Sequence, residues 1–97
     1  DLEPVIRHHH ERWDGGGYPS NLAGEQIPIG SRIILVADAY DAMLSERVYR
    51  ASMTHEAAID ELTRCAGSQF DPVVVEVFVE GVATAPVGAP PALAATR

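Results

Sequence analysis

The sequence predicts an all-α fold in one small domain. Three segments have the composition of helices: residues 30–45, residues 54–65 and the segment that begins at Asp71-Pro72. Between residues 14 and 28, glycines and prolines interrupt any regular pattern, so this segment is expected to be a loop. A chain of 97 residues can bury one modest core, which these elements are able to form.

The first part of the chain is expected to form the end of a helix over residues 2–12. Pro4 is tolerated there only near a first turn, and the helix must stop by Gly15. The loop 14–28 is long enough to have a function of its own and can contain a small hairpin.

The segment 30–45 is the strongest helix candidate. It starts at Gly30 or Ser31, and the run from Ile33 to Ala37 gives it apolar side chains on nearly every side. A helix of this kind is expected to be buried. The next helix begins at Thr54, whose hydroxyl can cap it, and has only a weak apolar stripe.

The last helix is expected to begin at Asp71-Pro72. The following run, 73–79, is rich in valine and favours a strand by propensity alone. Proline at the first helical position after a capping aspartate is a helix-entry signal, so a helix is predicted instead. From Gly81 the chain is rich in alanine and proline, which predicts a folded part over 1–80 and a disordered tail over 81–97.

Charge and cysteine content limit the classes of function. Seven Lys and Arg against fourteen Asp and Glu give a net charge of -7, which argues against binding DNA or RNA through the phosphate backbone. The single cysteine, Cys65, excludes an internal disulfide and fits a cytoplasmic location. No stretch approaches the roughly 20 apolar residues of a membrane span, and no signal peptide is recognisable.

Residues 9–19, His-His-Glu-Arg-Trp-Asp-Gly-Gly-Gly-Tyr-Pro, form the candidate site. Neutral imidazoles suit divalent transition metals, and glycines allow the backbone to turn closely around a bound group. On a helix the side chains of His9 and His10 would diverge by about 100° and reach different sides of a metal site. Taken alone, two such histidines are more often part of a surface run than metal ligands.

This pattern resembles the second half of the HD-GYP domain, a bacterial family of metal-dependent phosphohydrolases that degrade cyclic di-GMP. The resemblance continues through Leu22-x-Gly24-Glu25-x-Ile27-Pro28, Ala37-Asp38-x-x-Asp41-Ala42-Met43, Arg47-x-Tyr49-Arg50 and Gly67-x-x-Phe70-Asp71-Pro72. It implies the C-terminal part of an HD-type helical bundle with a Gly-Tyr-Pro loop. The chain contains no His-Asp dipeptide, the dyad that gives the family part of its name, so we expect a fragment of the domain.

The resemblance implies that His9, His10 and Asp38 are metal ligands, and this mixed donor set suits iron or manganese. Asp38 follows an apolar run, where a buried carboxylate requires a positive partner. Arg32 and Arg47 are the alternative partners to a metal. Three donors are too few for a bridged cluster, so the chain is expected to be inactive alone.

Other residues are expected to bind substrate. Arg47 and Arg50 can hold phosphate oxygens through planar, permanently charged guanidinium groups, or can pair with acidic side chains on the surface. The resemblance places Asp41 near the bound nucleotide, although a surface carboxylate is the alternative. It also implies that Tyr18 and Pro19 shape the substrate pocket or a docking surface.

Two acidic residues are expected to support the site. Glu11 can orient an imidazole, as metal-bound histidines usually require. Asp14 can cap the turn that ends the first helix. His8 is expected to face solvent.

The predicted function is metal-dependent hydrolysis of cyclic di-GMP to the linear dinucleotide or GMP. Relatives that act on other cyclic dinucleotides leave the exact substrate open. A second hypothesis is a non-catalytic module that docks a diguanylate cyclase domain through the Gly-Tyr-Pro loop. A third is a remnant without independent function.

Overall fold

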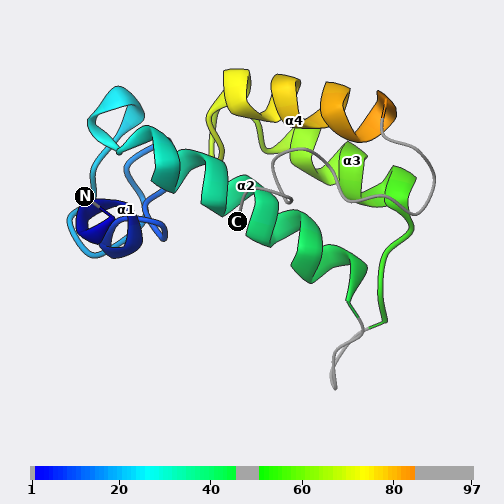
Figure 1. Ribbon diagram of the computed structural model, residues 1–97, viewed down its shortest axis with the longest axis horizontal. Coiled ribbons are helices and arrows are strands. Elements are labelled where there is room, and N and C mark those ends of the chain that lie inside the picture. The colour runs from blue at the N-terminus through cyan, green and yellow to red at the C-terminus, as the bar shows by residue number, and fades with distance from the viewer. Residues whose placement is uncertain (1, 46–50, 85–97) are drawn as a thin grey trace.

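The computed structural model describes residues 2–45 and 51–84, and the regular structure in these ranges is helical. The elements are α1 (Glu3–Arg7), the short 3-10 helix η1 (Gly24–Gln26), α2 (Ile29–Leu44), α3 (His55–Arg64) and α4 (Pro72–Thr84). α2 contacts each of the other three α-helices, with α1 near its start and α3 and α4 along its length (Figure 1). Apart from one isolated bridge, the described ranges contain no strand pairing, so the all-α prediction is confirmed and no hairpin forms.

α1 is much shorter than the predicted segment 2–12. Proline lies in its first turn, as expected, but the helix ends at Arg7. The Ser31 hydroxyl donates to the Val5 carbonyl at 2.7 Å. A Cβ at Gly30 would lie only 3.0 and 3.1 Å from the two Val5 methyl groups. The lack of a side chain at Gly30 therefore allows α1 to lie directly against the start of α2.

α2 begins at Ile29, and most of its residues are buried or half-buried. Its buried residues are Ser31, Val36, Ala37 and Tyr40. Asp38 is exposed. The prediction of a covered helix is confirmed in large part, whereas the prediction of a buried carboxylate within it is wrong. An apolar run places side chains all around a helix, but it does not reveal how many sides other elements cover.

α4 is helical despite its valines, because Asp71 caps it. The Asp71 carboxylate is buried and accepts a hydrogen bond from the Val73 amide at 2.8 Å. Its other oxygen accepts from Nη1 of Arg32 at 2.9 Å, and Nε of Arg32 donates to the Ile27 carbonyl, also at 2.9 Å. One buried ion pair thus joins the first turn of α2 to the start of α4.

The remaining helix boundaries differ little from the predictions. Thr54 caps α3 by accepting a hydrogen bond from the Ala57 amide at 3.1 Å, as expected. α4 continues to Thr84, so residues 81–84 are helical although they were predicted to belong to the tail. Residues 85–97 lie outside the described ranges. No described helix has both the length and the apolar character that crossing a membrane requires.

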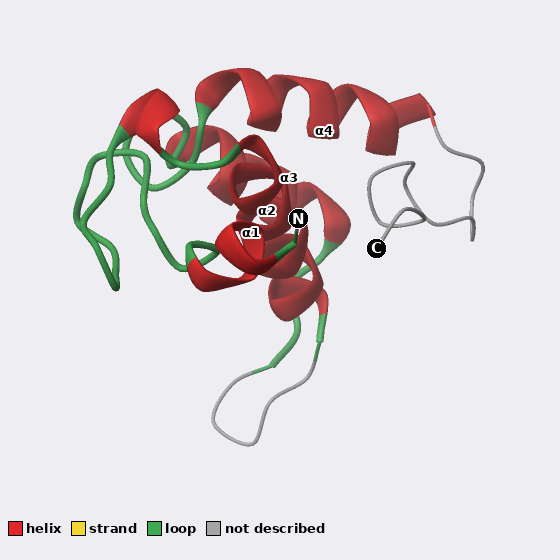
Figure 2. Ribbon diagram, turned by 60° about the vertical axis from the view of Figure 1, so that its left-hand side comes forward, coloured by secondary structure: helices red, strands yellow, loops and turns green. Residues whose placement is uncertain are grey.

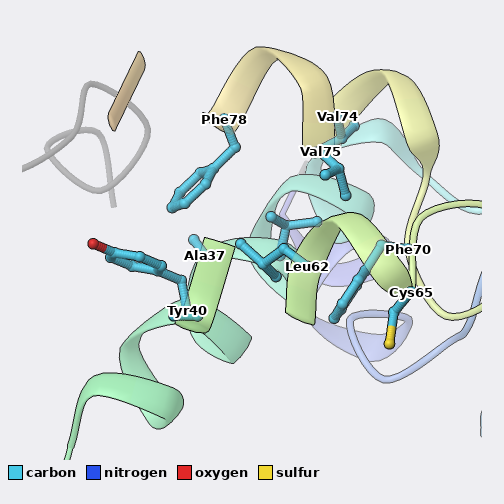
Figure 3. Close-up of a cluster of buried hydrophobic side chains, with 10 residues drawn as sticks. Ala37, Tyr40, Leu62, Cys65, Phe70, Val74, Val75 and Phe78 are labelled. Carbon is cyan, nitrogen blue, oxygen red and sulfur yellow. The ribbon is translucent and has the colours of Figure 1, made fainter. Parts of the chain in front are cut away.

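The core lies where α2, α3 and α4 meet. Leu62, Phe70 and Phe78 are each at most 1% exposed. The rings of Tyr40 and Phe78 meet edge to face with their centroids 5.1 Å apart, at one end of the cluster, while Phe70 and Cys65 lie at the other end (Figure 3). Burying a side chain of this size contributes about 1.5–3 kcal/mol, so these residues provide much of the cohesion between the three helices.

Replacing Asp71 by alanine is expected to destabilise the chain by about 3 kcal/mol, because the change removes the cap of α4 and leaves Arg32 without its partner. Urea unfolding followed by circular dichroism measures the loss. Asp60→Ala, which removes an exposed carboxylate on α3, is the matched control and should cost less than about 0.5 kcal/mol. Equal losses in the two variants would show that the ion pair has no structural role.

Cys65 is expected to react slowly with thiol reagents in the folded chain. Burial raises the pKa of its thiol, so the reactive thiolate is scarce near neutral pH. Alkylation by iodoacetamide at about pH 8 should be at least about tenfold slower in the folded chain than in urea, and should accelerate as the pH rises. Identical rates in both states would contradict the burial of this side chain.

Candidate functional site

The candidate site is built from two neighbouring segments between α1 and α2. Residues 8–10 form a turn directly after α1, here named the histidine turn. Residues 15–22 form the Gly-Tyr-Pro loop, which returns against that turn. Between them, the amides of Trp13 and Asp14 donate to the carbonyls of Gln69 and Ser68 at 3.0 and 2.8 Å. The site is therefore hydrogen-bonded to the segment between α3 and α4. In Figure 2 this segment and the loop between α1 and η1 are drawn in green.

The carboxylate of Glu11 joins the histidine turn to the Gly-Tyr-Pro loop. It is 1% exposed. It accepts hydrogen bonds from Nδ1 of His8 at 2.9 Å, the Ser20 amide at 2.8 Å and the Leu22 amide at 3.0 Å. Burial alone would raise the pKa of Glu11, but the hydrogen bonds from His8 and the two amides outweigh burial and lower it. The carboxyl group is therefore held in its charged form.

His8 does not face solvent, which corrects the prediction for this residue. Its side chain is only 15% exposed and is hydrogen-bonded to Glu11. Glu11 thus orients an imidazole, as predicted, but the imidazole is that of His8 and not of a predicted metal ligand.

The rings of His9 and His10 lie together and do not diverge. Their centroids are 4.0 Å apart, because the helix on which they were predicted to lie has already ended at Arg7. Nδ1 of His9 donates to the Ile6 carbonyl. Nε2 is then the nitrogen that has a lone pair when the ring is neutral, an arrangement typical of histidines that bind metals.

Tyr18 presents an exposed aromatic ring at the site. Its ring stacks on that of His10, with centroids 5.0 Å apart and an interplanar angle of 19°, and the residue is 62% exposed. The Tyr18 amide donates to the His10 carbonyl at 3.3 Å. The peptide bond to Pro19 is cis, and Pro19 is also exposed. Both predicted loop residues therefore present their surfaces beside the histidine turn.

Asp14 closes the turn that leads into the loop. Its Oδ1 accepts a hydrogen bond from the Gly16 amide at 2.9 Å, and its Oδ2 lies 2.9 Å from Nη2 of Arg12. Hydrogen bonds from Arg12 and then from the Gly16 amide lower the pKa of Asp14. Asp14 caps a turn as predicted, although this turn lies in the loop and not at the end of α1.

The two predicted site residues of α2 lie on its surface. Asp38 and Asp41 are both exposed, and a spacing of three residues places them on one face of the helix. Among the residues that the structure describes, no three histidine, cysteine or acidic side chains are placed to hold a metal ion. The imidazoles offer suitable donors, but the predicted set of His9, His10 and Asp38 does not close a metal site within this chain.

Neither arginine that was predicted as an alternative partner of Asp38 is seen to pair with it. Arg32 pairs with Asp71, as described above. Arg47, and with it Arg50, the other predicted phosphate ligand, lies outside the described residues.

Two structural features of the site were missed in the sequence. One is the pairing of His8 with Glu11, for which the three-residue spacing was the available signal. The other is the contact at Gly17, where a Cβ would lie well under 3.0 Å from the backbone of His10 and Arg12. Nothing in the single sequence distinguishes Gly17 from the two glycines before it.

Comparison with known proteins identifies the family. Residues 1–74, well over half of the chain, match the HD domain family model. The chain belongs to the HD domain family. The matched range of this HD domain chain includes the histidine turn, the Gly-Tyr-Pro loop and Asp38, and the expected relationship to HD-type phosphohydrolases is confirmed.

The relatives of this HD domain chain are longer bacterial proteins. It is 46% identical over 71 residues to a probable cyclic di-GMP phosphodiesterase of Vibrio cholerae, covering 73% of this chain and 16% of that protein. It is 48% identical over 77 residues to a cyclic di-GMP phosphodiesterase response regulator of Xanthomonas campestris, covering 79% of this chain and 20% of the regulator. A crystal structure of a cyclic GMP-AMP specific phosphodiesterase of Vibrio cholerae superposes with a TM-score of 0.73 at 36% identity, covering 87% of this chain and 19% of that one. The chain thus spans a fifth or less of these proteins.

Replacing Gly17 by alanine is expected to cost about 2–3 kcal/mol, because the new methyl group would force the Gly-Tyr-Pro loop away from the backbone of residues 10–12. Urea unfolding measures this loss. Gly16→Ala is the matched control, since the atoms nearest to its methyl group would be side-chain atoms of Asp14 and Arg12, at 3.1 Å or more. An equal cost for the two substitutions would contradict the close approach at Gly17.

Proposed function

We propose that this chain is the C-terminal, Gly-Tyr-Pro-containing part of a metal-dependent phosphodiesterase that hydrolyses cyclic di-GMP to the linear dinucleotide or GMP. The observation that carries the proposal is the family match over residues 1–74, joined to 46–48% identity with proteins named as cyclic di-GMP phosphodiesterases. Other relatives are named as specific for a cyclic GMP-AMP dinucleotide. The substrate class is therefore a cyclic dinucleotide, with cyclic di-GMP proposed first.

The proposed metal ligands are His9, His10 and Asp38, with iron or manganese as the metal. The described residues do not close a metal site, and segments outside them are proposed to supply further ligands and to bring Asp38 and the histidines to a common centre. Bound divalent ions would activate a water molecule and neutralise phosphoryl oxygens. The chain alone is proposed to be inactive.

The proposed substrate contacts lie around the Gly-Tyr-Pro loop and α2. The exposed ring of Tyr18, supported from behind by His10, offers a flat surface on which a nucleobase can stack. Pro19 shapes the same surface. Asp41 is proposed to bind the nucleotide from α2, and Arg47 and Arg50 are proposed to bind its phosphates.

Hydrolysis assays on the chain and on a protein extended upstream in its natural reading frame test the proposal. Cyclic di-GMP and cyclic GMP-AMP are followed chromatographically with iron(II) or manganese(II) in the absence of oxygen. We expect turnover by the extended protein only, and loss of most bound metal and of activity in its Asp38→Asn variant. Asp60→Asn, an exposed carboxylate on α3, is the control and should retain both.

Turnover by the 97-residue chain alone would contradict the proposed incompleteness. An inactive extended protein that retains its metal would contradict the proposed reaction.

One observation, the exposure of Tyr18, favours a second candidate function. In this alternative the Gly-Tyr-Pro loop docks a diguanylate cyclase domain and hydrolyses nothing. Binding of such a domain that survives a chelator and is lost in Tyr18→Ala, together with an inactive extended protein, would place this function first.

A further inference from the structure

Two backbone amides of the Gly-Tyr-Pro loop bond to one side chain, that of Glu11, which directly follows the histidine turn. The amides of Ser20 and Leu22 both donate to the carboxylate of Glu11, at 2.8 and 3.0 Å. The Tyr18 amide also donates to the His10 carbonyl, at the longer distance of 3.3 Å. The Glu11 carboxylate therefore helps to fix residues 20–22, while the close approach of Gly17 and the stacking of Tyr18 on His10 fix the start of the loop.

The orientation of that carboxylate depends in turn on His8. Leu22 bonds to Oε1, whereas Nδ1 of His8 and the Ser20 amide both bond to Oε2. The carboxylate is almost fully buried, so a missing donor is not replaced readily by water. Without the bond from His8, Glu11 can rotate about its side-chain bonds and draw the two loop amides with it.

We propose that His8 is a positioning residue for the Gly-Tyr-Pro loop. Its Nδ1–H group fixes the Glu11 carboxylate, Glu11 holds the amides of Ser20 and Leu22, and the loop in turn keeps the ring of Tyr18 stacked on His10. His8 itself contacts neither substrate nor metal. The effect on catalysis rests on the proposed function, because it assumes that the Tyr18 surface binds the nucleotide; the effect on the loop does not.

Asparagine provides a precise substitution for the test, because its side-chain amide can donate from nearly the position of Nδ1 of histidine. Leucine fills similar space and cannot donate. His8→Leu therefore removes the proposed interaction, and His8→Asn restores it without the imidazole.

The first measurement is amide hydrogen exchange by NMR on the 97-residue chain. His8→Leu should accelerate exchange at Ser20 and Leu22 by about tenfold or more, which corresponds to the loss of one hydrogen bond to a charged acceptor. His8→Asn should leave these amides close to wild type. The amide of Leu62, in the core helix α3, should not change in either variant. Unchanged exchange at Ser20 and Leu22, or equal acceleration at Leu62, would overturn the proposal.

The second measurement is steady-state kinetics in the upstream-extended protein. His8→Leu should raise KM for cyclic di-GMP by about tenfold with kcat changed less than about twofold, because the loop and not the reacting centre is displaced. His8→Asn should restore KM, and both variants should retain the wild-type metal content. Loss of metal without rescue by asparagine would instead make His8 a metal ligand and overturn the positioning role. If the wild-type protein hydrolyses nothing, the proposed function fails while the exchange result still decides the role of His8.

Discussion

The ion pair between Arg32 and Asp71 fixes the relative position of two helices that begin far apart in the sequence. The Asp71 carboxylate caps α4 and accepts from Arg32, whose side chain also donates to the Ile27 carbonyl at the end of the preceding loop. The two side chains are 15% and 4% exposed. An ion pair of this kind contributes little to net stability, because desolvation offsets much of its attraction. Its main effect is to fix where the two helices lie, and loss of one partner is costly because the other charge is left unpaired.

The same ion pair also determines where the candidate site lies. The connection between α3 and α4 ends at Asp71, and its carbonyls at Ser68 and Gln69 receive the amides of Asp14 and Trp13. The backbone that leads into the Gly-Tyr-Pro loop is thus bonded to a segment whose end the ion pair holds. Apolar packing stabilises the core of α2, α3 and α4. The site is instead held by hydrogen bonds to the segment that ends at Asp71, which the ion pair fixes.

The sequence was sufficient to predict α3 and α4 because each begins with a local signal. Thr54 and Asp71 cap the helices that follow them, and Asp71-Pro72 correctly outweighed the strand propensity of the valines. The burial of Asp38 was predicted wrongly, since the covered face of a helix depends on which elements pack against it. The placement of His9 and His10 was also wrong, because it depended on where α1 ends, and no capping or breaking residue marks Arg7 in the sequence. The backbone amides of Ser20 and Leu22, nine and eleven positions after Glu11, donate to its carboxylate. Every residue other than proline has such an amide, so these hydrogen bonds could not be predicted from the side chains.

The charges of the described residues bear on how an anionic substrate can bind. The chain has no lysine, and each of its arginines within the described ranges pairs with a carboxylate: Arg7 with Glu3, Arg12 with Asp14, Arg32 with Asp71 and Arg64 with Glu61. With a net charge of -7, these pairs offer little attraction to a phosphodiester. Two phosphates of a cyclic dinucleotide therefore require positive charge from Arg47 and Arg50, from bound metal ions or from segments outside this chain. If bound metal ions supply this charge in the proposed enzyme, metal binding and substrate binding are coupled, because without the ions the exposed carboxylates of Asp38 and Asp41 on α2 would repel the substrate.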